Sequence, residues 1–192
     1  MDQEQKWIEA ARQGDRNAFG RLVEAYQGPV FNLAYRMLSD AQEAEDAAQE
    51  AFLRAFRKLD SYDPTRKFST WLLSIASHHC IDRLRRRRLF WLSLEDEKFP
   101  PGALASHQPG PEQQTVRGEQ QAQIQALLDT LAPDYRSAVI LHYWNDLSYE
   151  EIAETTGSTV SAVKSRLFRA RRTLAQQLQE TDAQAGVMAL AF

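Results

Sequence analysis

Apolar residues recur at every third or fourth position along most of the chain, a spacing that predicts α-helices. Residues 5–27 follow it except where Gly14 and Asp15 interrupt the pattern, so we predict two helices there. Another helix is predicted over residues 29–40, because Pro29 is acceptable in a first helical turn. No segment alternates between apolar and polar residues for long enough to predict a β-strand.

Two further helices are predicted in the first half of the chain, within residues 40–62 and 68–88. Between them, the Asp, Ser and Pro content of residues 60–67 predicts a loop. The first of these helices carries one apolar stripe, which consists of Ala48, Phe52, Ala55, Phe56 and Leu59.

The composition changes at residues 93–118, which are rich in proline and glycine. Such a composition predicts a flexible linker. We therefore expect an all-α protein in which two small helical domains, residues 1–92 and 119–180, are joined by this linker. The apolar tail within residues 181–192 is too short to cross a membrane, and we expect a frayed end or a local packing patch there.

The second domain contains the signals of a helix-turn-helix. Ser148 and Glu151 have the spacing of a capping box, which predicts a short helix from Tyr149. Gly157 can adopt the left-handed conformation that ends such a helix. Ser158 or Thr159 can then cap the next one. Leu147 and Ile152 are placed for a hydrophobic staple at the first cap.

The helix that follows has an apolar face and a basic face, as a recognition helix in a DNA major groove requires. The predicted apolar face consists of Val163, Leu167, Ala170, Leu174 and Leu178. We expect Ser161, Lys164 and Ser165 to lie closest to base edges. Phosphate contacts are expected from Arg169, Arg171 and Arg172. An ordinary helical hairpin with a solvated basic face is the structural alternative.

Charge is distributed unevenly over the 192 residues, whose net charge is only −3. Five arginines, Arg83 and 85–88, lie close to Phe90 and Trp91. Basic residues beside aromatic ones suit nucleic acid with exposed bases, and Phe68, Trp71 and the loop precede this run. Alternatively, Phe68 and Trp71 are core residues, and the arginines form a solvated helix end.

An acidic face is predicted on the helix within residues 40–62. Asp46, Gln49, Glu50 and Leu53 share it and point away from the apolar stripe. It is either a solvated face or a docking surface for a basic protein partner.

Composition also excludes several classes of protein. A single cysteine, Cys80, excludes an internal disulfide framework and favours a cytoplasmic location. Consecutive residues on a helix point about 100° apart, so residues 78–80 (His-His-Cys) cannot converge on one metal ion. The chain has no phosphate-binding glycine loop and no zinc-protease motif, so we expect no catalytic residue, no cofactor, no metal and no enzymatic activity. No apolar run or signal-peptide core predicts membrane insertion.

Three segments, in this order, resemble an extracytoplasmic-function (ECF) sigma factor of bacterial RNA polymerase, in the sigma-70 superfamily. They are "EAEDAAQEAFLRAFRKL" (43–59), "FSTWLLSIASHHCIDRLRRRR" (68–88) and the helix-turn-helix region 128–174. The resemblance, which covers residues 7–178, implies a transcription initiation factor, commonly used in stress responses. Core RNA polymerase (its beta and beta-prime subunits), promoter DNA and an anti-sigma factor are the implied partners.

The resemblance also implies roles for single residues. Asp46, Gln49, Glu50 and Leu53 would dock on the polymerase clamp helices. The opened −10 element would be held by Lys67, Phe68, Trp71, His78, Arg83, Arg85, Arg86, Arg87 and Arg88. The −35 duplex would be held by Ser161, Lys164, Ser165, Arg166, Phe168, Arg169 and Arg172. The linker, with Glu95, Asp96 and Glu97, would enter the polymerase channels.

This sequence departs from the family pattern at two places. His78 stands where the family often has asparagine, and Ser161 and Ala162 replace a common Gly-Thr pair. We therefore expect altered −10 and −35 contacts. The rival hypothesis is a stand-alone helix-turn-helix regulator, which would bind duplex DNA tightly without polymerase.

Overall fold

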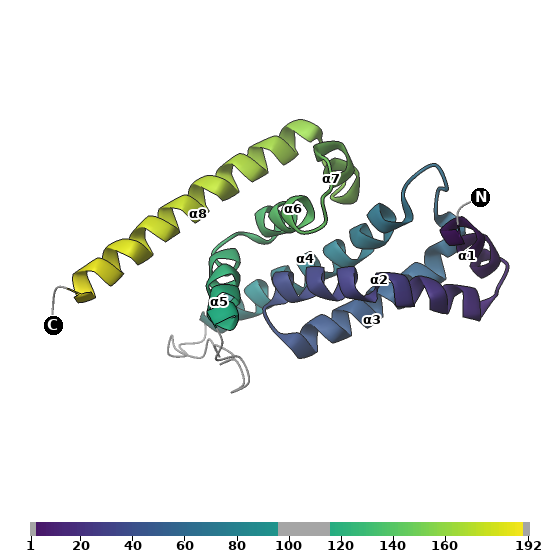
Figure 1. Ribbon diagram of the computed structural model, residues 1–192, viewed down its shortest axis with the longest axis horizontal. Helices are drawn as coiled ribbons and strands as arrows, with labels where there is room; N and C mark the ends of the chain where they lie inside the picture. Colours follow the sequence, from purple (N-terminus) through teal and green to yellow (C-terminus); the bar gives the residue numbers. More distant parts are fainter. Residues whose placement is uncertain (1–2, 96–115, 190–192) are drawn as a thin grey trace.

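The computed structural model describes residues 3–95 and 116–189 (Figure 1). Every regular element in these two ranges is a helix, as the spacing of apolar residues predicts. The elements are α1 (Gln3–Arg12), α2 (Arg16–Leu38), α3 (Ala41–Lys58), the 3₁₀ turn η1 (Leu59–Ser61), α4 (Phe68–Glu95), α5 (Val116–Asp129), α6 (Pro133–Tyr143), α7 (Tyr149–Thr155) and α8 (Val160–Ala189). None of these described helices combines the length and hydropathy needed to cross a bilayer.

The first domain is formed by α1 to α4, and short polar side chains fix where its helices begin. The Asp15 carboxylate accepts hydrogen bonds from the backbone N–H groups of Asn17 and Ala18, and so caps α2. Asp40 caps α3 in the same way by accepting from the N–H of Glu43. Gly14, with φ of +95°, makes the turn between α1 and α2. The predicted break at Gly14 and Asp15 is therefore confirmed.

The predicted helix start at Pro29 is wrong, because α2 runs through this residue without a break. Proline removes one backbone donor, so the carbonyl of the residue four positions earlier, Ala25, loses its usual partner. Ala25, Gly28 and Pro29 are all exposed, so water can satisfy that carbonyl. The missing hydrogen bond is tolerated because it lies on the solvent side of the helix.

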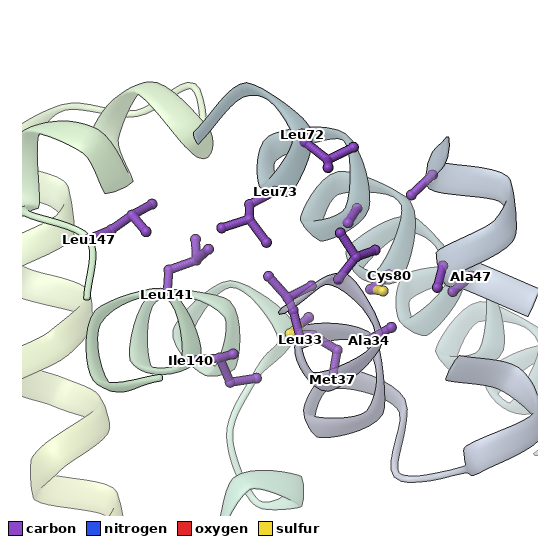
Figure 2. Packing of buried hydrophobic residues seen from close by; sticks show 14 of the residues in the cluster. Leu33, Ala34, Met37, Ala47, Leu72, Leu73, Cys80, Ile140, Leu141 and Leu147 are labelled. Atoms are coloured by element: carbon purple, nitrogen blue, oxygen red, sulfur yellow. The ribbon is translucent and has the colours of Figure 1, made fainter. Parts of the chain in front are cut away.

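The second domain is formed by α5 to α8, and α6 is its most buried helix. Residues 136–141 of α6 are buried without interruption, because the helix lies between α8 and the first domain. In Figure 2, Ile140 and Leu141 of α6 approach Leu33 and Met37 of α2 and Leu73 of α4. Buried residues of both domains thus form one apolar core, and the two domains are packed together.

The helices reach further than the predicted boundaries on both sides of the linker. α4 continues to Glu95 and α5 begins at Val116, so the ends of the predicted linker 93–118 are helical. The rest of the linker, including Asp96 and Glu97, lies outside the described residues. We expected a frayed end or a local packing patch at residues 181–192. Most of this tail continues α8 as helix to Ala189, and only its last three residues lie outside the described residues. Figure 1 shows this end of α8 projecting away from the other helices.

Replacing Leu141 by alanine tests the shared core. Leu141 is fully buried between the two domains, so we expect Leu141→Ala to lower the free energy of unfolding by about 2–5 kcal/mol. Urea denaturation followed by circular dichroism measures this change. The matched control, Leu178→Ala on the exposed end of α8, should change it by about 0.5 kcal/mol or less. Equal effects of the two substitutions would contradict the shared core.

Candidate nucleic-acid interface

Local hydrogen bonds build the predicted helix-turn-helix from α7 and α8. The backbone N–H of Glu151 donates to Ser148 Oγ at 3.2 Å, and the N–H of Ser148 donates to Glu151 Oε2 at 2.8 Å. This is the predicted capping box. Gly157 has a φ of +59°, and Thr159 Oγ1 accepts from the N–H of Ala162 at 3.2 Å at the start of α8. Cap, turn and second cap are thereby confirmed.

The two faces of α8 are those that the sequence predicts over its first three turns. Val163, Leu167 and Ala170 are buried against the domain, and the residues opposite them are exposed. Phe168 is 67% exposed, although it is a large apolar side chain. Arg166 is half-buried at the edge of the face. The exposed face consists of Ser161, Lys164, Ser165, Phe168, Arg169 and Arg172.

The apolar face predicted for α8 wrongly includes its last residue, Leu178, which is exposed. Leu174 is half-buried against the core. Leu178 lies one turn further on and is 50% exposed. The C-terminal end of α8 projects beyond the other helices (Figure 1). Helical periodicity gives the direction of a side chain, but the length of the neighbouring helices decides whether anything covers it.

Tyrosines of α6 hold two arginines of α8 in place. Arg171 Nε donates to the Tyr143 hydroxyl at 2.8 Å, and its guanidinium carbon lies 5.8 Å from the centre of that ring. Arg169 donates to the Tyr135 hydroxyl at 3.3 Å. Because these bonds restrict long side chains before any ligand binds, part of the basic face is already ordered.

On α3, the predicted acidic face is present and larger than expected. Asp46 and Gln49 are exposed, and Leu53 is 50% exposed. Glu50 accepts from Arg54 Nε at 2.7 Å, and this hydrogen bond lowers the pKa of the Glu50 carboxyl. Phe56, which we assigned to the apolar stripe, is 41% exposed and shares the surface. Its ring makes a T-shaped contact with that of Phe19, and the two ring centroids are 4.9 Å apart.

Phe68 and Trp71, at the start of α4, differ in burial, although the sequence suggested the same role for both. Phe68 is 1% exposed, and its ring lies 5.4 to 5.5 Å from those of Tyr26, Tyr62 and Trp71. Phe68 is therefore a core residue, which is one of the two interpretations that the sequence allowed. Trp71 is half-buried at the edge of this cluster, and Lys67 and His78 are exposed on either side of it.

The loop 60–67 is held in one shape by its own side chains. Thr65 donates to the Asp63 carboxylate through its N–H at 3.0 Å and its hydroxyl at 2.8 Å, which lowers the pKa of Asp63. A cavity of about 710 Å³ is lined by this loop and by α1. Its lining includes Glu4 and Arg12 of α1 and Arg66 of the loop. No pattern in the sequence indicates that α1 lies beside the loop, because this neighbourhood depends on how the helices pack.

The five arginines of α4 do not have equivalent surroundings. Arg83 pairs with Glu43 at 3.0 Å, and Arg87 pairs with the same carboxylate. Arg85 donates to both carboxylate oxygens of Asp134, each at 3.0 Å. Arg86 and Arg88 are exposed. Glu43 lies in the first turn of α3, and its pairing with α4 depends on the packing of these two helices.

The second domain also contacts the start of α4. Lys67 Nζ lies 2.8 Å from Glu151 Oε1, and the hydrogen bond from Lys67 is the main reason that the pKa of Glu151 is lowered. Glu151 thus serves the capping box of α7 and an ion pair with the first domain. Residues predicted to contact −10 DNA, Lys67 and Arg85, are therefore paired with acids of the domain predicted to bind −35 DNA.

The His-His-Cys sequence has no arrangement for a metal ion. Among residues 3–95 and 116–189, no group of three or more His, Cys, Asp or Glu side chains is placed to hold one. His78 is exposed, and burial lowers the pKa of His79. Cys80 is buried, which raises the pKa of its thiol to about 12.

Each of the two domains matches a known protein family. Residues 22–90 match the family model described as Sigma-70 region 2, and residues 121–174 match that of Sigma-70, region 4. The chain is 37% identical over 186 residues to the ECF RNA polymerase sigma factor SigW of Bacillus subtilis, covering 91% of this chain and 96% of that protein. It is 33% identical over 181 residues to the ECF RNA polymerase sigma-E factor of Escherichia coli, with 92% and 94% covered.

Solved structures have the same fold. CnrH, in its complex with the cytosolic domain of CnrY, matches with a TM-score of 0.68 and 26% identity, over 93% of this chain and 99% of that one. The sigma factor RpoE of Bartonella quintana, solved with the anti-sigma factor NepR, matches with a TM-score of 0.64 and 24% identity, over 84% and 96%. Together with the sequence matches, these likenesses show that the chain belongs to the sigma-70 family and is an ECF sigma factor.

Proposed function

We propose that this sigma factor directs core RNA polymerase to promoters by holding the −35 duplex with α8 and the opened −10 element with α4 and the loop 60–67. Like other sigma factors it acts as a transcription initiation factor and not as an enzyme. The observation that carries the proposal is the capped helix-turn-helix, whose second helix exposes a basic face next to a buried apolar one.

At the −35 element, the first turns of α8 enter the major groove. Ser161, Lys164 and Ser165 are exposed near its start, where a recognition helix approaches base edges. Phe168 is 67% exposed, and its apolar ring suits contact with a thymine methyl group. Phosphate contacts come from Arg166, Arg169 and Arg172.

At the −10 element, α4 presents cations along a face that also carries Trp71 and His78. Exposed aromatic rings stack on unpaired bases, and cations hold the backbone beside them. Trp71 keeps part of its ring accessible, whereas Phe68 has no exposed ring face and positions Tyr62 and Trp71 instead. Arg86 and Arg88 contact phosphates directly, and Arg83, Arg85 and Arg87 exchange a carboxylate for phosphate.

The exposed surface of α3 docks on core polymerase. It combines acids, Asp46 and Glu50, with the apolar side chains Leu53 and Phe56, and Gln49 lies between them. Such a mixture fits a basic helical surface with apolar positions, as we propose for the clamp helices of the largest polymerase subunits. Binding there would place the protein in the bacterial cytoplasm with its polymerase.

A protein inhibitor is the remaining proposed partner. CnrH was solved with the cytosolic domain of CnrY, and this likeness covers 93% of our chain. The sigma factor RpoE of Bartonella quintana was solved with the anti-sigma factor NepR. We propose that an anti-sigma factor also binds this chain.

Transcription in vitro tests the function as a whole. The purified chain is mixed with core RNA polymerase and a library of genomic fragments, and run-off transcripts are sequenced. We expect transcripts that begin downstream of one shared pair of promoter elements. Tight binding of duplex fragments without polymerase, and no added transcripts, would favour the stand-alone regulator.

Glu50→Lys tests the docking surface. The substitution places a cation beside Arg54 and Arg57 on the proposed surface, so we expect at least about a tenfold loss of affinity for core polymerase. Co-purification with tagged core polymerase measures it. Glu24→Lys makes the same charge change at an exposed residue of α2 and should retain binding. Equal retention by both variants would exclude this part of α3 as the docking surface.

Lys164→Ala tests the assignment of the two promoter elements to the two domains. We expect holoenzyme with this variant to bind −35 duplex about 5- to 100-fold more weakly, because one contact near a base edge is lost. Binding to a template with a pre-melted −10 element and no −35 element should not change. Fluorescence anisotropy on both templates measures this, and equal losses on the two would contradict the assignment.

A further inference from the structure

Two arginines flank the exposed face of α8, one on each side. Consecutive residues of a helix point about 100° apart, so Arg169 and Arg171 point about 160° apart around the axis of α8. Phe168, on the exposed face, lies between these two directions. Both arginines are exposed. When the exposed face turns towards a DNA duplex, one cation is therefore available on either side of it.

Each of these arginines is held by a tyrosine from a different end of α6. Tyr135 lies in the first turn of α6 and Tyr143 is its last residue, which places them about 12 Å apart along the helix axis. An α-helix with its side chains is about 10–12 Å wide. Since α6 packs against α8, its two ends can present one hydroxyl on each side of the recognition helix.

The groups that hold the two arginines are neutral hydroxyls. Arg171 Nε donates to the Tyr143 hydroxyl at 2.8 Å, and Arg169 donates to the Tyr135 hydroxyl at 3.3 Å. The bond to Tyr143 is the main reason that the pKa of Arg171 is raised. A hydroxyl fixes the direction of a guanidinium group without cancelling its charge, whereas the carboxylates beside three arginines of α4 do cancel it.

The tyrosines themselves are fixed by their neighbours. His142 Nδ1 donates to the backbone carbonyl of Leu147 at 3.1 Å, which orients the imidazole ring. The centre of this ring lies 4.8 Å from that of Tyr143 and 5.2 Å from that of Tyr149. Tyr135 is half-buried and packs against the core. Tyr143 is 51% exposed and yet held by these contacts, so its hydroxyl has a defined place beside α8.

We propose that Tyr135 and Tyr143 are positioning residues for −35 recognition, which direct Arg169 and Arg171 to phosphates on the two opposite strands that border the major groove. The inference rests on the proposed function, because it requires α8 to lie in the −35 duplex. The major groove is about 12 Å wide, so a helix inside it has a phosphate backbone on each side. The bond to Tyr143 uses Nε of Arg171, and the terminal NH₂ groups of the guanidinium supply the hydrogen bonds to phosphate oxygens.

A double-mutant cycle tests the pair with the shorter bond. Fluorescence anisotropy of holoenzyme on the −35 duplex, at several salt concentrations, measures the affinity. We expect Arg171→Ala to weaken binding about 5- to 50-fold and to lower the slope of log Kd against log salt by about one. Tyr143→Phe, which removes only the hydroxyl, should weaken binding about 2- to 10-fold in the wild type and not at all when Arg171→Ala is already present.

Two outcomes of the cycle would overturn the proposal. If Tyr143→Phe weakens binding equally with and without the arginine, or has no effect in either background, the tyrosine does not act through Arg171. A phosphate contact contributes equally on every base sequence, so the ratio of affinities for the −35 duplex and a scrambled duplex should stay the same in Tyr143→Phe. A fall in this ratio would mean that the hydroxyl only supports the structure of α8, and it would also overturn the proposal.

Duplexes with single neutral methylphosphonates test the assignment of the two arginines to opposite strands. A neutral group cannot repay the charge of an arginine, so the loss caused by Arg171→Ala should disappear when the phosphate that it contacts is replaced. We expect the sensitive position for Arg171→Ala on one strand and that for Arg169→Ala on the other. Sensitive positions on the same strand, or none on either, would contradict the proposed arrangement.

Controls separate this proposal from the function on which it rests. Tyr26→Phe removes a hydroxyl that donates to Glu4 in the first domain, and it should leave −35 binding and its salt slope unchanged. If Lys164→Ala also leaves −35 binding unchanged, the proposed function fails. If Lys164→Ala weakens binding while Tyr143→Phe and Arg171→Ala do not, the positioning role is overturned and the function stands.

Discussion

The burial of α6 between α8 and the first domain is the contact on which the rest of the structure depends. Ile140 and Leu141 complete the core of the second domain and also meet α2 and α4 of the first (Figure 2). Because the same helix serves both cores, the domains cannot separate without exposing apolar side chains to water. Separation therefore needs a partner that binds the open form better than the closed one.

Local chemistry explains which parts of the fold the sequence predicts correctly. Asp15, Ser148 and Gly157 act within three or four residues of their own position, so their roles follow from the sequence alone. Pro29 was wrongly predicted to begin a helix. A proline within a helix is tolerated where the turn around it is exposed to solvent, and only the packing of the helices determines that exposure. The packing of the two domains was not predictable either, because a helix buried on two sides has no single apolar face to reveal its neighbours.

In the candidate site, too, the sequence predicts what depends on local position and not what depends on distant contacts. Helical periodicity was sufficient to place Phe168, Lys164 and the other exposed residues of α8, because direction on a helix depends only on position. It placed Asp46 and Leu53 for the same reason, but it assigned Phe56 to the core, where packing leaves room for only part of that ring. The ion pair of Lys67 with Glu151 joins residues 84 positions apart, and no spacing rule reaches that far.

The arginine run of α4 now has an explanation that its sequence alone did not supply. A net charge of −3 is compatible with five clustered arginines because acids from α3 and α6 lie against three of them. These carboxylates stabilise the folded chain, yet each pair is partly exposed to solvent and so contributes little to overall stability. Weak, partly exposed pairs can exchange one partner for another, as the proposed contact of these arginines with promoter phosphates requires.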